Sequence, residues 1–249
     1  MTLSSVKMNI DRDFLRDLMG SVTDRCIICG ADIFDNFTGF CQHCIKDVVF
    51  NNGKTCLRCG VRITGEENYC SNCVSGEMWF DRAYSAFSYE GNIVKAIHSL
   101  KFGNMAGYAK VLAGYLAYIA VGKNIPFDVV CYVPMTERAE KLRRYNQSQL
   151  LSQYFCDILS KDRPLPLLVK VRETQRQEQL DKYSRLRNLD NAFKADKNYD
   201  IKNKTVLVID DVKTTGTTLE QCARALKKAG ASRVYCLTVA SREEKVLVQ

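Results

Sequence analysis

Two adjacent carboxylates and the threonine- and glycine-rich turn after them are the residues of this chain best suited to chemistry. Asp210 and Asp211 come directly after the apolar run Val206 to Ile209, which predicts a buried strand. The turn then runs through the following residues: Lys213, Thr214, Thr215, Gly216, Thr217 and Thr218. A helix is expected to begin near its end, because apolar residues recur beyond it at helical spacing.

This order of elements suits a sugar phosphate. Backbone N–H groups at a helix N-terminus attract a phosphate dianion, and Lys213 adds a cation beside the turn. Ionised Asp210 and Asp211 only accept hydrogen bonds, which suits the vicinal hydroxyls of a sugar. In an open α/β sheet, ligands bind at the carboxyl ends of the strands, where these residues would lie. A diol and a phosphate at this spacing describe ribose 5-phosphate.

Eight of the 12 cysteines form four Cys-x-x-Cys pairs. They are Cys26/Cys29, Cys41/Cys44, Cys56/Cys59 and Cys70/Cys73. A two-residue gap lets a tight turn present two thiolates to one tetrahedral metal ion. Gly30 and Gly60 follow the first and third pairs at equivalent positions, which indicates an internal duplication. We therefore expect two structural zinc ions, each held by four thiolates, because four repeated pairs do not suit a redox role.

The sequence leaves two ways of grouping these pairs. A sequential arrangement joins the first pair to the second and the third to the fourth. An interleaved arrangement joins the first to the third and the second to the fourth. We favour the sequential arrangement, because each duplicated half then closes its own site. His43 is a further candidate ligand, although four thiolates already satisfy zinc. A segment this short buries too little apolar surface to fold without its metal.

Strand and helix patterns alternate after residue 80. Strands are expected at 81–89, 127–133, 167–171, 206–209 and 233–239, and helices at 93–102, 108–120, 146–161 and from 217 onward. This alternation predicts an α/β fold, with a parallel sheet covered by helices on both faces. We expect a zinc-binding domain over 1–80 and an α/β domain over 81–249. No linker rich in Gly, Ser or Pro separates them, so the two should pack directly together.

Composition and charge further narrow the class of protein to which this chain can belong. The chain has 249 residues, of which 46% are hydrophobic and 26% charged, as in a globular protein. Its start is studded with charges and lacks the apolar stretch of a signal peptide. The longest nearly apolar run, 111–122, is shorter than the roughly 20 residues of a membrane span. We therefore expect a cytoplasmic protein without membrane insertion.

The excess of positive over negative charge lies in the α/β half. Residues 1–80 carry 8 Lys and Arg against 10 Asp and Glu, whereas residues 81–249 carry 28 against 18. A nucleic acid would therefore bind the α/β half. Two basic segments stand out within it, 138–147 and 172–187. Asn146, in the first, is expected to cap the helix that follows, with Gln149 as its capping-box partner.

The acid pair and its turn resemble the PRPP-binding loop of type I phosphoribosyltransferases, which is four apolar residues, two acids and Thr-Thr-Gly-x-Thr. Together with the cysteine pairs, nearly the whole chain resembles the ComF family of bacterial competence proteins. Lys101-Phe102-Gly103 loosely matches the family's Lys-Phe-x-Gly element. Pro134, Arg138 and the run from Arg144 to Gln147 stand where the family shows Pro, Arg and Arg-Gly-Phe-Asn-Gln. The segment from Thr174 to Phe193 matches a further family element.

The resemblance implies a type I phosphoribosyltransferase fold with a small N-terminal zinc-binding domain. It also implies that PRPP or a related ribose phosphate binds together with Mg²⁺. The residues implied in binding are Lys101, Arg138, Arg144, Asp210, Asp211, Lys213, Thr214, Thr215, Gly216, Thr217 and Thr218. Asp210 and Asp211 would be the catalytic residues, holding the ribose hydroxyls directly or through Mg²⁺. Arginine suits the diphosphate, because its guanidinium binds phosphate oxygens in pairs.

Two functions from different classes follow from the resemblance. The family name implies DNA uptake in natural transformation, with single-stranded DNA, a competence helicase or recombination proteins as partners. Tyr145 and Tyr183 are then candidates for stacking on bases. The alternative is a true phosphoribosyltransferase of nucleotide metabolism, whose acceptor the sequence does not identify. We favour the first function. A purely structural scaffold is disfavoured, because the acid pair and the Thr-Gly turn are intact.

Overall fold

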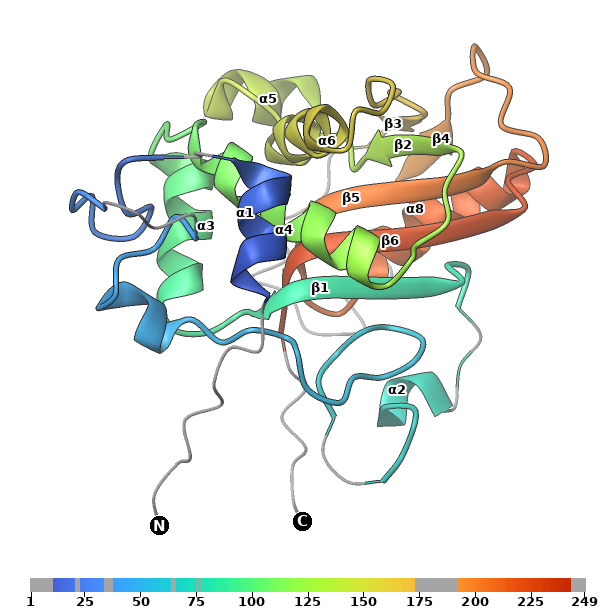
Figure 1. Ribbon diagram of the computed structural model, residues 1–249. Coiled ribbons are helices and arrows are strands. Elements are labelled where there is room, and N and C mark those ends of the chain that lie inside the picture. Colours follow the sequence, from blue (N-terminus) through green and yellow to red (C-terminus); the bar gives the residue numbers. More distant parts are fainter. Residues whose placement is uncertain are drawn as a thin grey trace.

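Four parallel strands form the central sheet, in the order β1-β6-β5-β2 (Figure 1). The computed structural model describes residues 11–20, 23–33, 38–63, 66–74, 76, 78–172 and 192–242. The strands are β1 (Arg82–Ser88), β2 (Val129–Tyr132), β5 (Thr205–Lys213) and β6 (Arg233–Ser241). The parallel α/β sheet predicted from the sequence is therefore present.

Helices cover both faces of this sheet. One face carries α3 (Asn92–Phe102), α4 (Tyr108–Gly122) and α6 (Gln147–Ile158), and α1 (Arg12–Met19) packs on α4. The other face carries α8 (Thr217–Lys228). A short helix, α5 (Glu137–Arg143), precedes α6. Within the described part of the chain, no helix is both long enough and apolar enough to cross a membrane.

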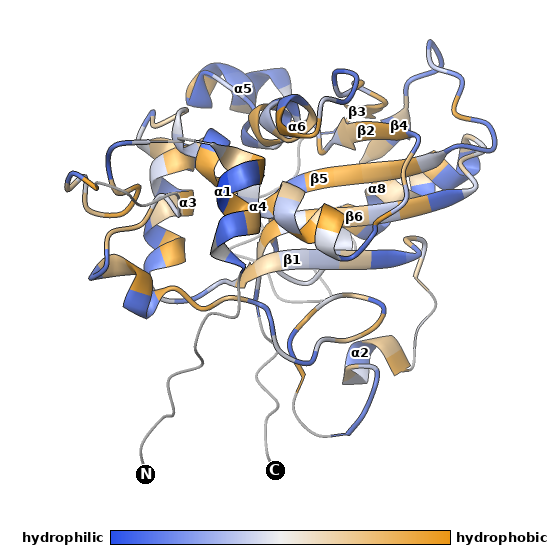
Figure 2. Ribbon diagram, in the orientation of Figure 1, coloured by the Kyte–Doolittle hydropathy of each residue, from blue (hydrophilic) through white to orange (hydrophobic). Residues whose placement is uncertain are grey.

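The alternation of side chains along β5 divides the core in two. Leu207 and Ile209 face the cluster that contains α4 and α6, whereas Val206 and Val208 face α8. Successive side chains of a strand point to opposite faces, so a strand segment that packs against helices on both sides is apolar at consecutive positions. Figure 2 shows β5 and β6 largely in the orange of apolar residues, in contrast to the blue of α5.

The strand predicted at 167–171 forms, but it does not join the parallel sheet. It appears as β3 (Leu168–Lys170) and pairs antiparallel with β4 (Phe193–Ala195) in a separate two-stranded sheet. The residues before β3 make one isolated bridge to β2, between Leu165 and Cys131. Proline on either side of Leu165 has no backbone N–H to donate, so the ladder cannot extend along this edge.

Strand β5 is longer than the sequence predicted. It continues past Ile209 through both aspartates to Lys213, because β6 runs beside it to the end, with Asp210 opposite Thr238 and Lys213 opposite Ser241. Strand β2 stops earlier, at Tyr132, which lies opposite Ile209. The two carboxylates therefore belong to the strand itself, at the point where its neighbour β2 has ended.

The cysteine-rich half packs directly on the α/β half, as expected. The ring of Phe50 lies 5.0 Å from that of Phe87 on β1, and Phe87 lies 4.9 Å from Tyr115 on α4, between ring centroids. Among the described residues of this half between 23 and 80, the helices are η1 (Cys44–Asp47) and α2 (Ser71–Val74). Its apolar residues thus share the core of the sheet, and the domain boundary near residue 80 stays a prediction.

Candidate functional site

The acid pair (Asp210 and Asp211) lies almost buried at the carboxyl end of β5, with 8% and 7% of each residue exposed. Oδ1 of Asp210 accepts a hydrogen bond of 2.7 Å from the Ser148 hydroxyl and one of 2.9 Å from the Asp211 backbone N–H. Burial and the neighbouring Asp211 carboxylate raise the pKa of Asp210 to about 7. Near neutral pH this carboxyl is therefore poised between its protonated and ionised forms.

Lys101, in the last turn of α3, neutralises the second carboxylate. Its Nζ lies 3.1 Å from Oδ2 of Asp211. Burial alone would lower the pKa of Lys101, but the Asp211 carboxylate outweighs it and holds the pKa above its ordinary value. The structure thus brings Lys101 and the acid pair into one buried cluster, although 109 residues separate the lysine from Asp210 in the sequence.

The Thr-Gly turn (residues 214–218) links β5 to α8. Gly216 stands at the N-cap of α8 with φ +82°, a left-handed conformation that residues with a Cβ rarely adopt. The hydroxyls of Thr215 and Thr217 lie 2.8 Å apart. Gly216 has no side chain with which to cap α8, and the backbone N–H of Thr217 donates to the Thr215 hydroxyl at 3.5 Å. The partial positive charge of a helix N-terminus favours a bound anion here.

The basic residues implied in binding occupy two kinds of position. Lys213 is buried, and its side chain passes 3.9 Å from the place where a Cβ on Gly216 would stand. Arg138 and Arg144 are exposed, in α5 and at its C-terminal end. Arg138 also borders an open hollow of about 650 Å³. The segment from Thr174 to Asn188, including Tyr183, lies outside the described residues.

Ser148 is a site residue that the sequence analysis missed. It lies in the first turn of α6, whose N-cap is Asn146, as predicted, with the Asn146 side chain accepting from the N–H groups of Ser148 and Gln149. Ser148 and Ser152 are four residues apart and both buried. The two serines on the buried face of this helix were the signal in the sequence that could have identified the site, because a buried hydroxyl needs a hydrogen-bond partner.

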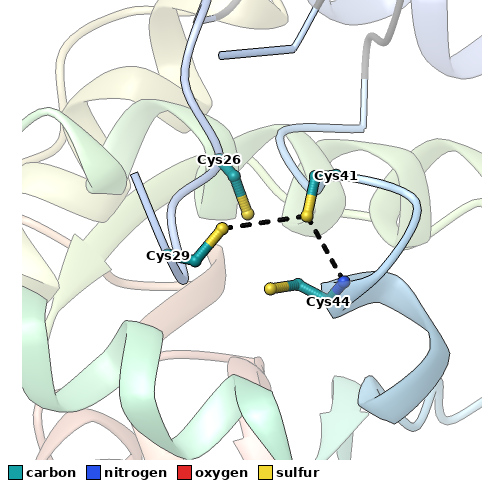
Figure 3. A group of neighbouring side chains, drawn as sticks. All are labelled: Cys26, Cys29, Cys41 and Cys44. Atoms are coloured by element: carbon teal, nitrogen blue, oxygen red, sulfur yellow. Dashed lines mark hydrogen bonds between the residues drawn. The ribbon is translucent and has the colours of Figure 1, made fainter. Parts of the chain in front are cut away.

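The first cysteine cluster joins the first two Cys-x-x-Cys pairs, as the sequential arrangement requires. Its four sulfur atoms lie within 4.8 Å of one another, and the Sγ atoms of Cys29 and Cys41 are 3.8 Å apart. Figure 3 shows the four thiols converging from two loops on one point. With zinc–sulfur bonds of about 2.3 Å, a tetrahedral site places its sulfur atoms about 3.8 Å apart. The geometry therefore fits zinc.

The second cysteine cluster repeats the first. The third and fourth pairs converge within the same limit, and the Sγ atoms of Cys59 and Cys70 are 3.6 Å apart. Gly30 and Gly60 have positive φ, and each donates its N–H to the carbonyl of the first cysteine of its pair. The duplicated sequence therefore folds into duplicated metal knuckles. His43 belongs to neither cluster in the described part of the chain.

Comparison with known protein families matches each half separately. Residues 148–249 match the family model of the phosphoribosyl transferase domain, and residues 22–74 match the double zinc ribbon domain. The fold and these matches define a protein in which a double zinc ribbon is followed in the sequence by a phosphoribosyltransferase-type α/β domain. Together with the sulfur geometry, the second match supports structural zinc at both cysteine clusters.

The chain aligns with three curated relatives over nearly their full lengths. DNA utilization protein YhgH of Salmonella typhimurium is 29% identical over 227 residues, covering 88% of this chain and 98% of that protein. YhgH of Escherichia coli strain K12 is 28% identical over 228 residues, with the same coverage. Competence protein F of Haemophilus influenzae is 28% identical over 225 residues, covering 87% of this chain and 96% of that protein. These relatives and the two domain matches support the resemblance of this chain to the ComF family.

Proposed function

We propose that this protein binds the ribose 5-phosphate part of PRPP at the acid pair and the Thr-Gly turn. The observation that carries the proposal is the buried acid pair near the carboxyl end of a parallel strand, followed by a short turn and a helix whose N-cap is Gly216. The turn and α8 then offer N–H groups to the 5-phosphate, and the carboxylates accept from the ribose hydroxyls.

The remaining charges suit the diphosphate. Arg138 and Arg144 are exposed, and arginine binds phosphate oxygens in pairs, so we assign them to the diphosphate. Lys213 adds a cation beside the turn, and Lys101 forms an ion pair with Asp211. Magnesium would accompany the ligand, since it prefers phosphate oxygens and retains several of its own waters.

The names of the relatives support a role in DNA uptake. Two are named DNA utilization proteins and one a competence protein. The excess of Lys and Arg in residues 81–249 suits a polyanion, and single-stranded DNA is the form that α5 and the basic segment beyond Arg172 would bind. PRPP would then act as a regulatory ligand of a protein that handles single-stranded DNA.

Transfer of the ribose 5-phosphate to an acceptor is the second candidate, and the intact acid pair favours it. In that reaction the bond from the anomeric carbon to the diphosphate breaks, a bond to a nucleophile forms, and diphosphate leaves. The chain's residues would stabilise the cationic sugar and the leaving charge and would exclude water.

Calorimetry with Mg²⁺ and PRPP tests the ligand. The wild type should bind, and the double variant Asp210→Asn/Asp211→Asn should lose about a hundredfold or more in affinity, because two charged acceptors are lost. Asp162→Asn, at an exposed position, is the matched control and should bind as the wild type does. Equal affinity of the double variant and the wild type would remove the acid pair from the site.

Titration of a labelled oligothymidylate at several salt concentrations tests the DNA role. Affinity should fall with salt, with a slope of about −0.7 per phosphate neutralised on a single strand. Competition by PRPP would indicate a shared basic surface. No binding even at low salt, together with diphosphate release when a nucleobase or an amine is added, would leave the transferase as the function.

A further inference from the structure

Phe102, the last residue of α3, is an aromatic ring left open to solvent beside the candidate site. It is 56% exposed, although the preceding residue, Lys101, turns inward to Asp211. Successive helical residues point about 100° apart, so the same turn of α3 presents a buried cation and an exposed ring. The exposed ring is therefore a candidate contact surface for a binding partner.

Two neighbours flank this ring. The guanidinium carbon of Arg143, at the end of α5, lies 5.0 Å from the ring centroid, within the range of a cation–π contact. The ring of His98, one helical turn earlier in α3, lies 5.3 Å away at an interplanar angle of 50°. These three residues form an aromatic surface with one guanidinium against it, the Phe102 platform (His98, Phe102 and Arg143).

The surroundings of the platform are basic. The neighbouring helix α5, together with Arg144 directly after it, carries more cations than anions. The cations are Arg138, Lys141, Arg143 and Arg144, and the anions are Glu137 and Glu140. Figure 2 shows α5 largely in the blue of hydrophilic residues. A polyanion could therefore follow α5 while one of its flat groups rests on the ring.

We propose that the Phe102 platform stacks an unpaired base of single-stranded DNA whose phosphates lie along α5. The proposal rests on the proposed function and gives its DNA partner a place to bind. Every base has a π face, so a ring flanked by arginine accepts any sequence, and the cations around it attract the backbone. A polyanion suits this surface better than an apolar protein partner, because a guanidinium lies against the ring and cations outnumber anions on α5.

Tyr145, which the sequence offered for stacking, does not suit this role. Its hydroxyl donates to the carbonyl of Leu100, and its ring packs against the main hydrophobic core. The tyrosine thus joins α3 to the start of α6 and presents no free face for a base. Phe102 takes that role because α3 ends there and leaves its ring outside the core.

The chain offers a matched control elsewhere. Tyr69 is 42% exposed and lies under the guanidinium of Arg58, whose central carbon is 5.7 Å from the ring. Its sequence neighbours, Glu66 and Glu67, are acidic, in the half of the chain with the negative charge balance. Phe102→Ala and Tyr69→Ala therefore remove the same kind of group from opposite electrostatic surroundings.

Fluorescence anisotropy with the full chain tests the platform. The probes are a labelled oligothymidylate and an abasic oligonucleotide of equal length, titrated at several salt concentrations. Phe102→Ala should weaken oligothymidylate binding by about five- to a hundredfold without changing the salt slope, and should leave abasic binding unchanged. Phe102→Trp should restore binding, and Tyr69→Ala should bind as the wild type does. Unfolding midpoints verify that each variant is folded.

Each contrary outcome is distinct. Equal loss for the two oligonucleotides, or equal loss in Tyr69→Ala, overturns the platform while DNA binding itself stands. Unchanged oligothymidylate binding in Phe102→Ala also overturns the platform while DNA binding stands. A wild type that binds neither oligonucleotide at low salt overturns both the platform and the DNA role, whereas PRPP binding would be unaffected. Tight binding of free thymidine monophosphate that competes with the oligonucleotide would identify a mononucleotide pocket instead and overturn the strand-binding proposal.

Discussion

The backbone N–H of Trp79 donates a hydrogen bond of 2.7 Å to Oε1 of Glu220, joining the end of the cysteine-rich half to the first turn of α8. Beside this contact, Cys56, Cys59 and Cys73 share a hydrophobic core with Leu219 of α8. The second zinc ribbon is therefore built against the helix that follows the Thr-Gly turn, whereas the first ribbon packs against the opposite core with α4.

Replacing Glu220 should test this link. Glu220→Ala leaves the Trp79 N–H without its acceptor and should lower the free energy of unfolding by about 1–3 kcal/mol. Glu220→Gln keeps an acceptor oxygen and should stay within about 1 kcal/mol of the wild type, since burial already raises the pKa of Glu220 and disfavours its charged form. Urea unfolding measures both variants, and an equal loss in each would show that the hydrogen bond contributes little.

Zinc content gives a second prediction. The wild type should hold two zinc ions per chain, and Cys29→Ser and Cys70→Ser should each hold about one, because each removes one ligand of a different cluster. Loss of the second ion should weaken PRPP binding more than loss of the first, because only the second cluster shares the core of α8. Metal analysis and calorimetry on the same preparations measure both effects. Equal PRPP affinities in the two variants would contradict the coupling.

Local signals were enough to predict much of this architecture. The Cys-x-x-Cys spacing fixes which thiols can converge, and Gly30 and Gly60 supply the left-handed turns that the knuckles need. The apolar run before Asp210 predicts a buried strand, because a strand covered on both faces is mostly apolar. Sequence periodicity reports such features well, since each depends on residues a few positions apart.

Contacts between distant segments were not predictable in this way. Lys101 meets Asp211, and Ser148 meets Asp210, only because α3 and α6 cover the same face of the sheet. Likewise, β5 extends through the acid pair because β6 continues beside it. Phe102 was read as part of a motif, and its exposure follows from where α3 ends relative to α5. Tertiary packing decides these details, and no local pattern encodes them.

The acid pair predicts a pH dependence of stability. Burial and Asp211 raise the pKa of Asp210 to about 7, so the folded carboxyl keeps its proton over a range where the unfolded one has lost it. The free energy of unfolding should therefore fall as the pH rises from about 4 to 7. Asp210→Asn keeps the acceptor Oδ1 for Ser148 and removes the buried charge. It should raise the free energy of unfolding at about pH 8 by about 1–3 kcal/mol, and much less at about pH 5.

The same substitution should weaken PRPP binding, so stability and binding would change in opposite directions. Urea unfolding at the two pH values, with calorimetry at the higher one, measures both. Ser148→Ala is a useful comparison, because it removes a donor to the Asp210 carboxylate and should raise the pKa of Asp210 further. A variant destabilised equally at both pH values would show that Asp210 is held in its ionised form by the fold.

Lys101 gives the last prediction. Lys101→Met removes the partner of Asp211 and leaves two adjacent buried carboxyls without a cation, which should cost about 3–5 kcal/mol of unfolding free energy near neutral pH. The double variant Lys101→Met/Asp211→Asn should recover most of that loss, because no unpaired charge then remains. The loss in the single variant should shrink as the pH falls and the carboxyls take up protons. Urea unfolding of the single and double variants measures the coupling. Equal stabilities of the wild type, the single variant and the double variant would mean that the 3.1 Å ion pair between Lys101 and Asp211 contributes nothing to the fold.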